Sequence, residues 1–321
     1  MKNRYFLSAL VAAMVALPGL FSCNSEVFID DFAPSDESIL VPSDGHAKVI
    51  DFKSDSWNIF DVYTVNGGAL TGDVYDADGQ WLGSDPMYVE PGWTKFVLDH
   101  PTVTLTVERT KGDKLRVTST ENASGQPFEC FIDVGNDYDR RYIRVEVEPS
   151  ETYQLDSIVY RLNSWLGQDS VPWHPKSELI IPYPKEEPTT YVITPYERQS
   201  YQVQFTFYDD NPLAIFGGNK PEVPLVDVDD FGWPYVADRK MPLDADVHEF
   251  PVPDSLLEVE EQVTIPAHSP CEIRSYWWYK FYGVDFTVYA SHPRTGRKQE
   301  FKGELDLYKP QAYEIYIVPW N

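Results

Sequence analysis

The sequence predicts an all-β protein built from two β-sandwich domains, the second of them loop-rich and Pro-rich. Short segments in which apolar and polar residues alternate recur along the chain, and turn-forming residues separate them. No segment shows a convincing amphipathic helix pattern. Of the 26 prolines, 15 fall between residues 171 and 270, where they exclude long helices and central strands. Strands at such spacing are typical of sandwiches and barrels.

The first half of the chain contains about eight short candidate strands. The segment Asp44-Gly45 lies between the first two of them and predicts a hairpin, because glycine tolerates positive φ. A second hairpin is expected at Lys111-Gly112-Asp113, between two clearly alternating runs. The candidate strands are residues 38–41, 48–52, 57–59, 62–65, 103–107, 115–118, 128–134 and 142–147.

The second half contains fewer segments with a recognisable strand pattern. A polar turn cluster at residues 148–151 precedes a change in composition, and it predicts a boundary between domains at 36–149 and 150–321. The candidate strands of the second domain are residues 201–207, 271–281, 284–289, 301–307 and 313–317.

The first 22 residues resemble a secretory leader. Lys2 and Arg4 provide a positive start, and an apolar run follows that is too short to span a bilayer comfortably. The run ends in Leu20-Phe21-Ser22-Cys23, which resembles the lipobox of bacterial lipoproteins. The resemblance implies cleavage after residue 22 and acylation of Cys23, with residues 23–35 as the lipidated tether. Several acyl chains on one cysteine would anchor the protein durably, whereas one chain binds reversibly.

The residues after Cys23 bear on the destination of the protein. Asn24 occupies the position where Asp favours inner-membrane retention in the lipoprotein family, and Glu26, Asp30 and Asp31 resemble the acidic export signals of Bacteroidetes surface lipoproteins. The resemblance implies an outer-membrane lipoprotein that is exposed on the cell surface. The membrane is then a partner through the N-terminal lipid.

The segment that follows the tether resembles a known module. Leu40-Val41-Pro42-Ser43-Asp44-Gly45, together with residues 48–52 and Trp57-Asn58-Ile59, is similar to the opening of the BACON-type modules of Bacteroidetes lipoproteins. Those modules are immunoglobulin-like sandwiches found on surface proteins and on glycan-processing enzymes. The resemblance implies a scaffold for residues 36–149, interrupted by an insert at residues 67–91.

Charge and missing motifs exclude several function classes. The net charge is −25, from 26 Lys and Arg against 51 Asp and Glu, which disfavours nucleic-acid binding because phosphate backbones would be repelled. The sequence has no nucleophile elbow, phosphate-binding loop, dinucleotide fingerprint or zinc-type spacing of His and Cys. We therefore expect no enzymatic activity. An exported Cys130 and Cys271 could form a disulfide, but they lie in different predicted domains, and buried free thiols are the simpler expectation.

Aromatic residues in acidic, Pro-rich segments are the candidate ligand-binding residues. Flat rings stack on the apolar faces of sugars, and carboxylates accept hydrogen bonds from hydroxyl groups. The simpler interpretation is that these rings hold their own loops against the sandwich. The candidates are Trp233, Tyr235, Asp229 and Asp230 in one segment and Trp165 and Trp173 in another.

Two acidic runs raise the question of calcium, although no metal site is predicted. Asp227, Asp229 and Asp230 could supply some of the six to eight oxygens that calcium requires. The other run, from Asp73 to Gly79, is better explained as a hairpin turn.

Taken together, these features predict a lipid-anchored cell-surface binding or structural protein. It would serve as an adhesin or as an accessory of glycan capture, with a glycan or an outer-membrane protein as its partner. Two alternatives remain open. One is a pore-forming β protein, because residues 263–269 resemble the strand after the insertion hairpin of aerolysin-type toxins. The other is a glycan-active hydrolase, which needs only two suitably spaced carboxylates.

Overall fold

The computed structural model describes residues 31–163, 166–172, 176–229 and 231–320, and it confirms the predicted all-β sandwich fold. The chain forms two compact units. Unit 1 comprises residues up to Asn122 together with Gln126–Ser150, and unit 2 comprises Ala123–Gly125 together with residues from Glu151 onward. None of the helices in the described ranges has the length and apolar character needed to cross a bilayer.

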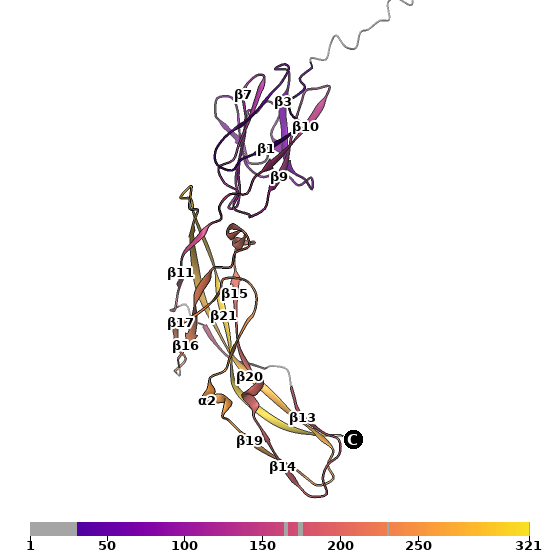
Figure 1. The fold of residues 1–321 in the computed structure, drawn as a ribbon, viewed down its shortest axis with the longest axis vertical. Coiled ribbons are helices and arrows are strands. Elements are labelled where there is room, and N and C mark those ends of the chain that lie inside the picture. Colours follow the sequence, from indigo (N-terminus) through magenta and orange to yellow (C-terminus); the bar gives the residue numbers. More distant parts are fainter. Residues whose placement is uncertain (1–30, 164–165, 173–175, 230, 321) are drawn as a thin grey trace, which may run out of the picture. The chain divides into compact units, whose positions relative to one another are not determined.

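Unit 1 is a sandwich of a four-stranded and a six-stranded sheet (Figure 1). The first sheet has the order β1 (Ser38–Val41), β10 (Arg140–Val147), β9 (Phe128–Gly135) and β3 (Asn58–Thr64). The second has the order β2 (Lys48–Asp51), β8 (Lys114–Thr118), β7 (Thr104–Lys111), β6 (Lys95–Asp99), β4 (Asp73–Tyr75) and β5 (Trp81–Gly83). A short 3₁₀ helix, η3 (Pro86–Tyr88), follows β5.

Two tryptophans lie at the centre of unit 1. Trp57 and Trp93 are both buried, and the ring of Trp57 stacks on that of Phe52 with centroids 3.9 Å apart. The guanidinium of Arg109 lies 4.5 Å from the centre of the Trp57 ring and donates to the backbone oxygens of Asp55 and Gly112. Aromatic stacking and the cation–π contact therefore hold the segment before β3 against the core.

One predicted hairpin is confirmed and another is wrong. β7 and β8 pair around a tight turn at Gly112 and Asp113, as the sequence predicts. The turn at Asp44-Gly45 also forms, with Gly45 at φ +93°, but it does not join two paired strands. β1 instead runs parallel to β10 in one sheet, and β2 pairs with β8 in the other. The turn therefore carries the chain from one layer of the sandwich to the other.

Unit 2 is organised around a seven-stranded sheet. Its main path is β11 (Gln154–Tyr160), β20 (Cys271–Ser291), β21 (Lys298–Pro319), β15 (Ser200–Phe207) and β18 (His248–Pro251). Beyond β11, the same edge of β20 pairs with β12 (Leu166–Pro172) and β13 (Lys176–Ile181). Two small sheets complete the unit: β14 (Thr189–Ile193) with β19 (Glu261–Ile265), and β16 (Glu222–Val228) with β17 (Pro234–Pro242). The helical turns are η4 (Pro195–Arg198), η5 (Pro212–Phe216) and α2 (Asp254–Leu257).

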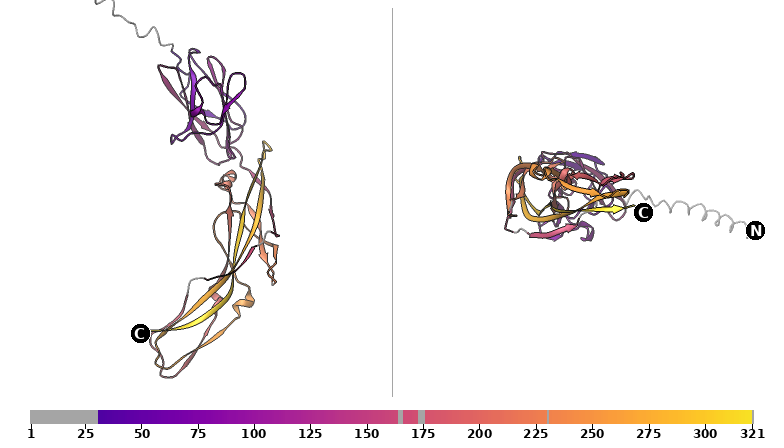
Figure 2. Two further views of the ribbon diagram at one scale, coloured as in Figure 1. Left: turned by 180° about the vertical axis from the view of Figure 1, so that it is seen from behind. Right: turned by 90° about the horizontal axis from the view of Figure 1, so that it is seen from below.

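Two long strands replace four that the sequence predicts separately. β20 has 21 residues and β21 has 22, and they pair along their whole length (Figure 2, orange and yellow). Pro310 does not end β21, because a bulge there places Gln311 outside the ladder and the pairing resumes at Ala312. The Pro-rich region likewise contains β13 to β19, so it is richer in strands than its composition suggests.

The core of unit 2 is divided along these two strands. A large cluster, which includes Phe205, Phe216 and Phe286, fills the space between the main sheet and the β16–β17 hairpin. A second cluster surrounds Trp277 and Tyr196 in the middle of the unit. A third lies between β14–β19 and the end of the main sheet formed by β13, β20 and β21. The opposite face of the main sheet carries the more polar residues of each strand.

Candidate functional site

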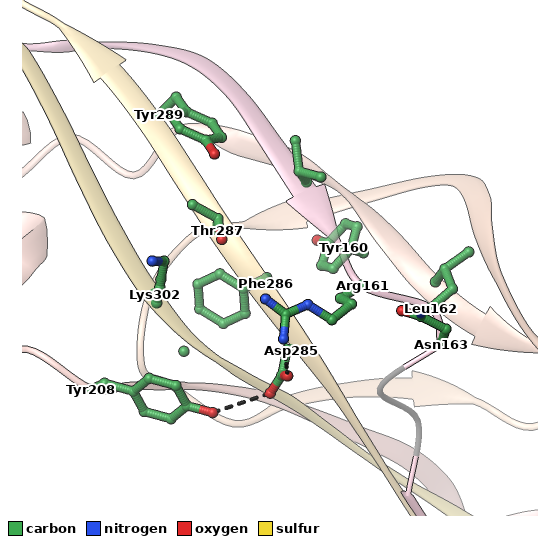
Figure 3. Close-up of a pocket in the computed structure, with 12 residues that line it drawn as sticks. Tyr160, Arg161, Leu162, Asn163, Tyr208, Asp285, Phe286, Thr287, Tyr289 and Lys302 are labelled. Carbon is green, nitrogen blue, oxygen red and sulfur yellow. Dashed lines mark hydrogen bonds and ion pairs between the residues drawn. The ribbon is translucent and has the colours of Figure 1, made fainter.

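A hollow of about 750 Å³ opens on the polar face of the main sheet in unit 2. Its walls come from the end of β11, the residue after β15, and the facing parts of β20 and β21 (Figure 3). We call it the outer-face hollow. The side chains used below are those of Arg161, Tyr208, Asp285, Thr287, Tyr289 and Lys302.

Strand alternation explains why these side chains share one face. On β20, Phe286 and Val288 are buried in the core, while Asp285, Thr287 and Tyr289 occupy the alternate positions. Successive residues of a strand point to opposite faces, so the three latter side chains leave the core together. The same alternation sends Lys302 of β21 and Tyr208, which follows β15, to this face.

Two side chains of the outer-face hollow contact the carboxylate of Asp285. The hydroxyl of Tyr208 donates to its Oδ1 at 3.2 Å, and Nη1 of Arg161 lies 3.5 Å from its Oδ2 (Figure 3). The backbone supports this arrangement, because the N–H of Arg161 donates to the carbonyl of Asp285 at 2.8 Å and the N–H of Tyr208 donates to the carbonyl of Lys302 at 3.0 Å. Burial, followed by the charge of Asp285, raises the pKa of Tyr208, so its hydroxyl stays a donor at neutral pH.

Two more carboxyl groups continue along the same face. Glu304 is the cross-strand partner of Asp285, and Asp306 follows two residues later on β21. Oγ1 of Thr206 donates to Asp306 at 3.1 Å. Burial raises the pKa of Asp306 from 3.8 to about 6, and the charge of Glu304 acts in the same direction. This carboxyl group is therefore partly protonated in mildly acidic solution.

The hollow combines flat rings with hydrogen-bonding groups of both kinds. Tyr208 is 62% exposed, and the exposed ring of Tyr289 lies on the other side of Thr287 from Asp285. Asp285 accepts hydrogen bonds, whereas Arg161 and Lys302 donate them. Such a surface can bind a polyhydroxylated ligand, because the rings contact its apolar faces while the polar groups hold its hydroxyls.

The segment predicted as a ligand site forms the turn of the β16–β17 hairpin. Oδ1 of Asp229 accepts from the backbone N–H groups of Phe231 and Trp233 at 2.9 and 2.8 Å. Trp233 is 68% exposed and Tyr235 is also exposed. The ring of Trp233 therefore does not pack the turn against the sandwich. The interpretation that this ring packs its own loop is wrong. The turn places Asp229 in contact with the backbone of Trp233, and neither they nor Tyr235 lines the outer-face hollow.

The other predicted site residues have different outcomes. Asp227 forms an ion pair with Lys309 at 2.5 Å, which engages one of the proposed calcium ligands. Asp230, Trp165, Trp173 and Cys23 lie outside the described residues. Within the described ranges, no group of three or more His, Cys, Asp or Glu residues is arranged to hold a metal ion.

The second acidic run and the cysteines have clear structural roles. Oδ1 of Asp76 accepts from the backbone N–H groups of Asp78 and Gln80, which shows that this run forms the turn between β4 and β5, as predicted. Cys130 and Cys271 are free and buried, which agrees with the expected thiols. Burial raises the pKa of Cys130 to about 12, so its thiolate is not available for chemistry.

Sequence reasoning missed the outer-face hollow. The alternation of Asp285, Thr287 and Tyr289 is visible in the sequence and indicates a shared face. Nothing in the sequence shows that Tyr208, Lys302 and Arg161 join them, because this depends on the pairing of strands that lie far apart in the chain.

Comparison with known proteins adds no assignment. No protein-family model matches the chain, and no curated protein sequence matches it. Among solved structures, the crystal structure of a lamprey immune protein aligns with 91% of this chain and with 100% of its own chain. The TM-score is 0.29 and the sequence identity is 9%. A TM-score this low assigns neither fold nor function. The lipobox and BACON resemblances therefore remain predictions.

Proposed function

We propose that the protein is a lipid-anchored cell-surface protein that binds carbohydrate in the outer-face hollow. The observation that carries the proposal is the position of Asp285 between the hydroxyl of Tyr208 and the guanidinium of Arg161, beside exposed aromatic rings. The residues come from separate strands of a paired sheet, so the recognition groups are held in place before a ligand arrives. The volume of about 750 Å³ lies in the range of small-molecule sites.

The charges around the hollow favour a neutral sugar. Arg161 faces the carboxylate of Asp285 at 3.5 Å, and Nζ of Lys302 lies 3.1 Å from Glu300. Each cation is therefore matched by a nearby acid, and an anionic ligand would gain little attraction. Hydroxyl groups suit this environment better, because they can donate to Asp285 and accept from Arg161.

A glycan array probed with purified residues 24–321 tests the proposal. A glycan that binds is then titrated by calorimetry against Tyr208→Ala and Asp285→Asn. We expect each change to weaken binding at least tenfold, which corresponds to about 1.4 kcal/mol. The control is Tyr88→Ala, which removes an even more exposed tyrosine from unit 1 and should alter affinity less than twofold. A silent array, or hollow variants that bind as tightly as the wild type, would exclude carbohydrate binding at this site.

The anchor is tested separately. Metabolic labelling with palmitate should mark the wild-type protein and not Cys23→Ser, because the acyl chains require the cysteine. Protease added to intact cells should degrade the labelled protein if it is surface-exposed. Absence of label from the wild type would contradict the anchor while leaving the carbohydrate proposal intact.

One observation favours glycan hydrolysis as a second candidate function. Asp306, with its pKa raised to about 6, lies near Glu304, and such a pair can divide the roles of acid and base. The Cα atoms of residues two apart on a strand lie about 6.7 Å from each other. Two side chains that leave one face at this spacing can place their carboxyl groups at the separation of about 6.5–9.5 Å found in inverting glycosidases. Release of reducing ends from bound glycans, lost in Glu304→Gln, would support hydrolysis. Binding without release would exclude it.

A further inference from the structure

At one end of unit 2, two facing layers differ in their number of strands. The larger layer has three strands at this point, because residues 271–275 of β20 pair with β13 on one side and with β21 on the other. In the described part of the chain, the facing layer has two strands, β14 and β19. A small apolar cluster fills the space between the layers. Figure 1 shows β13, β14 and β19 gathered at this end of unit 2.

The exposure of the inner face rises where the smaller layer stops. Leu179, Ile273 and Ile317 are cross-strand neighbours and form one row on β13, β20 and β21. Ile273 is fully buried at 0% exposure, whereas Ile317 is 42% exposed. The two strands of the smaller layer therefore cover β20 but leave the inner face of β21 partly open. An additional strand beside β19 would cover it.

A groove of about 490 Å³ lies at this uncovered position. Residues 261–264 of β19 form one side, and Tyr313, Ile315 and Ile317 of β21 form the other. The three β21 residues are alternate positions of one strand, so they belong to one face. The groove is therefore bounded by a strand edge and by the partly apolar face of the opposite layer.

Both strands beside the groove have an unpaired edge. Within the described residues, β19 pairs with β14 alone. The pairing of β21 with β15 ends at Tyr308, so residues 312–319 pair with β20 alone among the strands that the structure describes. Unpaired edges present backbone donors and acceptors that bind another extended chain. Addition of a strand is a recurrent mode of peptide recognition, in which backbone bonds give affinity and alternate side chains give specificity.

Charge indicates the kind of chain that fits. Glu258, Glu260 and Glu261 lie at the start of β19, and none has an ion-pair partner in the part of the chain that the structure describes. Glu261 itself lines the groove and accepts from the hydroxyl of Tyr313 at 3.2 Å. A basic residue on the incoming chain would be attracted to this end. A second copy of this chain fits less well, because the net charge is −25.

The geometry points to a binding groove for an extended peptide segment of a partner protein, at the edge of β19. The segment pairs with β19 through its backbone, places alternate apolar side chains over Ile315 and Ile317, and carries Lys or Arg near Glu261. This inference is independent of the carbohydrate proposal, since the groove shares no residue with the outer-face hollow.

Synthetic peptides and purified residues 24–321 test the groove. The probe is a blocked nonapeptide in which valine alternates with threonine and a lysine stands at each end. Two control peptides have either the valines grouped together or glutamate in place of lysine. We expect the alternating basic peptide to bind at least tenfold more tightly than either control, measured by fluorescence anisotropy. At saturation, hydrogen exchange of the groove-facing amides in residues 261–265 should slow at least tenfold.

Two matched variants distinguish the groove from general apolar binding. Ile317→Asp places a charge on the inner face and should reduce peptide affinity at least tenfold. Ile180→Asp changes the same residue type in the same layer, where Ile180 is 54% exposed and pairs opposite the outer-face residue Glu272. This control should change affinity less than twofold, and thermal melts of both variants verify folding.

Three results would overturn the inference. The first is failure of the alternating peptide to bind, with exchange in β19 unchanged. The second is an equal loss of affinity in the two variants. The third is a concentration-dependent dimer, seen by light scattering, that protects β19 without peptide, because it would assign the groove to a second copy of the chain.

Discussion

Replacing Asp306 by Asn is expected to stabilise the protein at neutral pH and to leave it nearly unchanged at pH 3.5. Burial raises the pKa of Asp306 from 3.8 to about 6. Because the folded-state pKa is the higher one, the folded protein binds more protons in this interval, and stability falls as pH rises from about 4 to about 6. Asn cannot ionise and retains an oxygen that can accept from Thr206.

The size of the effect follows from the two pKa values. The difference between about 6 and 3.8 is about 2.2, which at about 1.4 kcal/mol for each pKa unit gives an upper value of about 3 kcal/mol. Asp306 keeps some contact with solvent, which reduces this to about 1–2 kcal/mol. For a unit of this size, that corresponds to an increase in Tm of roughly 3–6 °C.

Scanning calorimetry at pH 3.5 and pH 7.5 measures the difference directly. Asp210→Asn serves as the control, because it removes one negative charge from an exposed turn of the same unit. Any gain shared by both variants reflects lower overall repulsion. If Asp306→Asn raises the Tm no more at pH 7.5 than at pH 3.5, or no more than the control does, burial is not what raises the pKa of this group.

Three further outcomes follow from packing and burial. Gly303→Ala should lower the free energy of unfolding in urea by about 2–3 kcal/mol, because the added Cβ would meet the backbone of the adjacent strand. Gly283→Ala should cost less, because its Cβ would meet only the side chain of a glutamate, which can move. Equal losses of stability in the two variants would contradict this explanation. Cys130 should not react with a thiol reagent until the protein is unfolded, and rapid labelling of the native protein would show that it is accessible. Arg109→Lys should cost about 1–2 kcal/mol of stability, because Lys cannot reproduce the bonds to two backbone oxygens, and an unchanged Tm would refute that role.

The sequence predicts strands well where alternation is local. The runs that become β1, β9, β15 and most of β10 are expected within one or two residues of their observed ends. Alternation also indicates that Asp285 and Tyr289 share a face. These features need only the period of two residues, which every strand imposes on its own side chains.

Local sequence patterns do not predict which strands pair with each other. The turn at Gly45 has the residues of a hairpin, yet β1 and β2 belong to different sheets. β1 pairs with β10 and β2 pairs with β8, and both partners lie far along the chain. In β21, Pro310 looks like a strand end because the bulge that accommodates it depends on the position of β20. The outer-face hollow was not predicted for the same reason, since Arg161 and Asp285 meet only through the pairing of β11 with β20.

The paired strands β20 and β21 are longer than the elements that pack on them, and both proposed sites lie where this strand pair is left uncovered. Toward the turn between them, the β16–β17 hairpin and the large core cover one face, which leaves the polar face to form the hollow around Asp285. Toward the other end, the two-stranded layer is too narrow to cover the inner face at Ile317. The sites therefore use opposite faces and different ends of one strand pair. Because they share no residues, loss of sugar binding in Tyr208→Ala should leave peptide affinity unchanged, and failure of one proposal does not remove the support for the other.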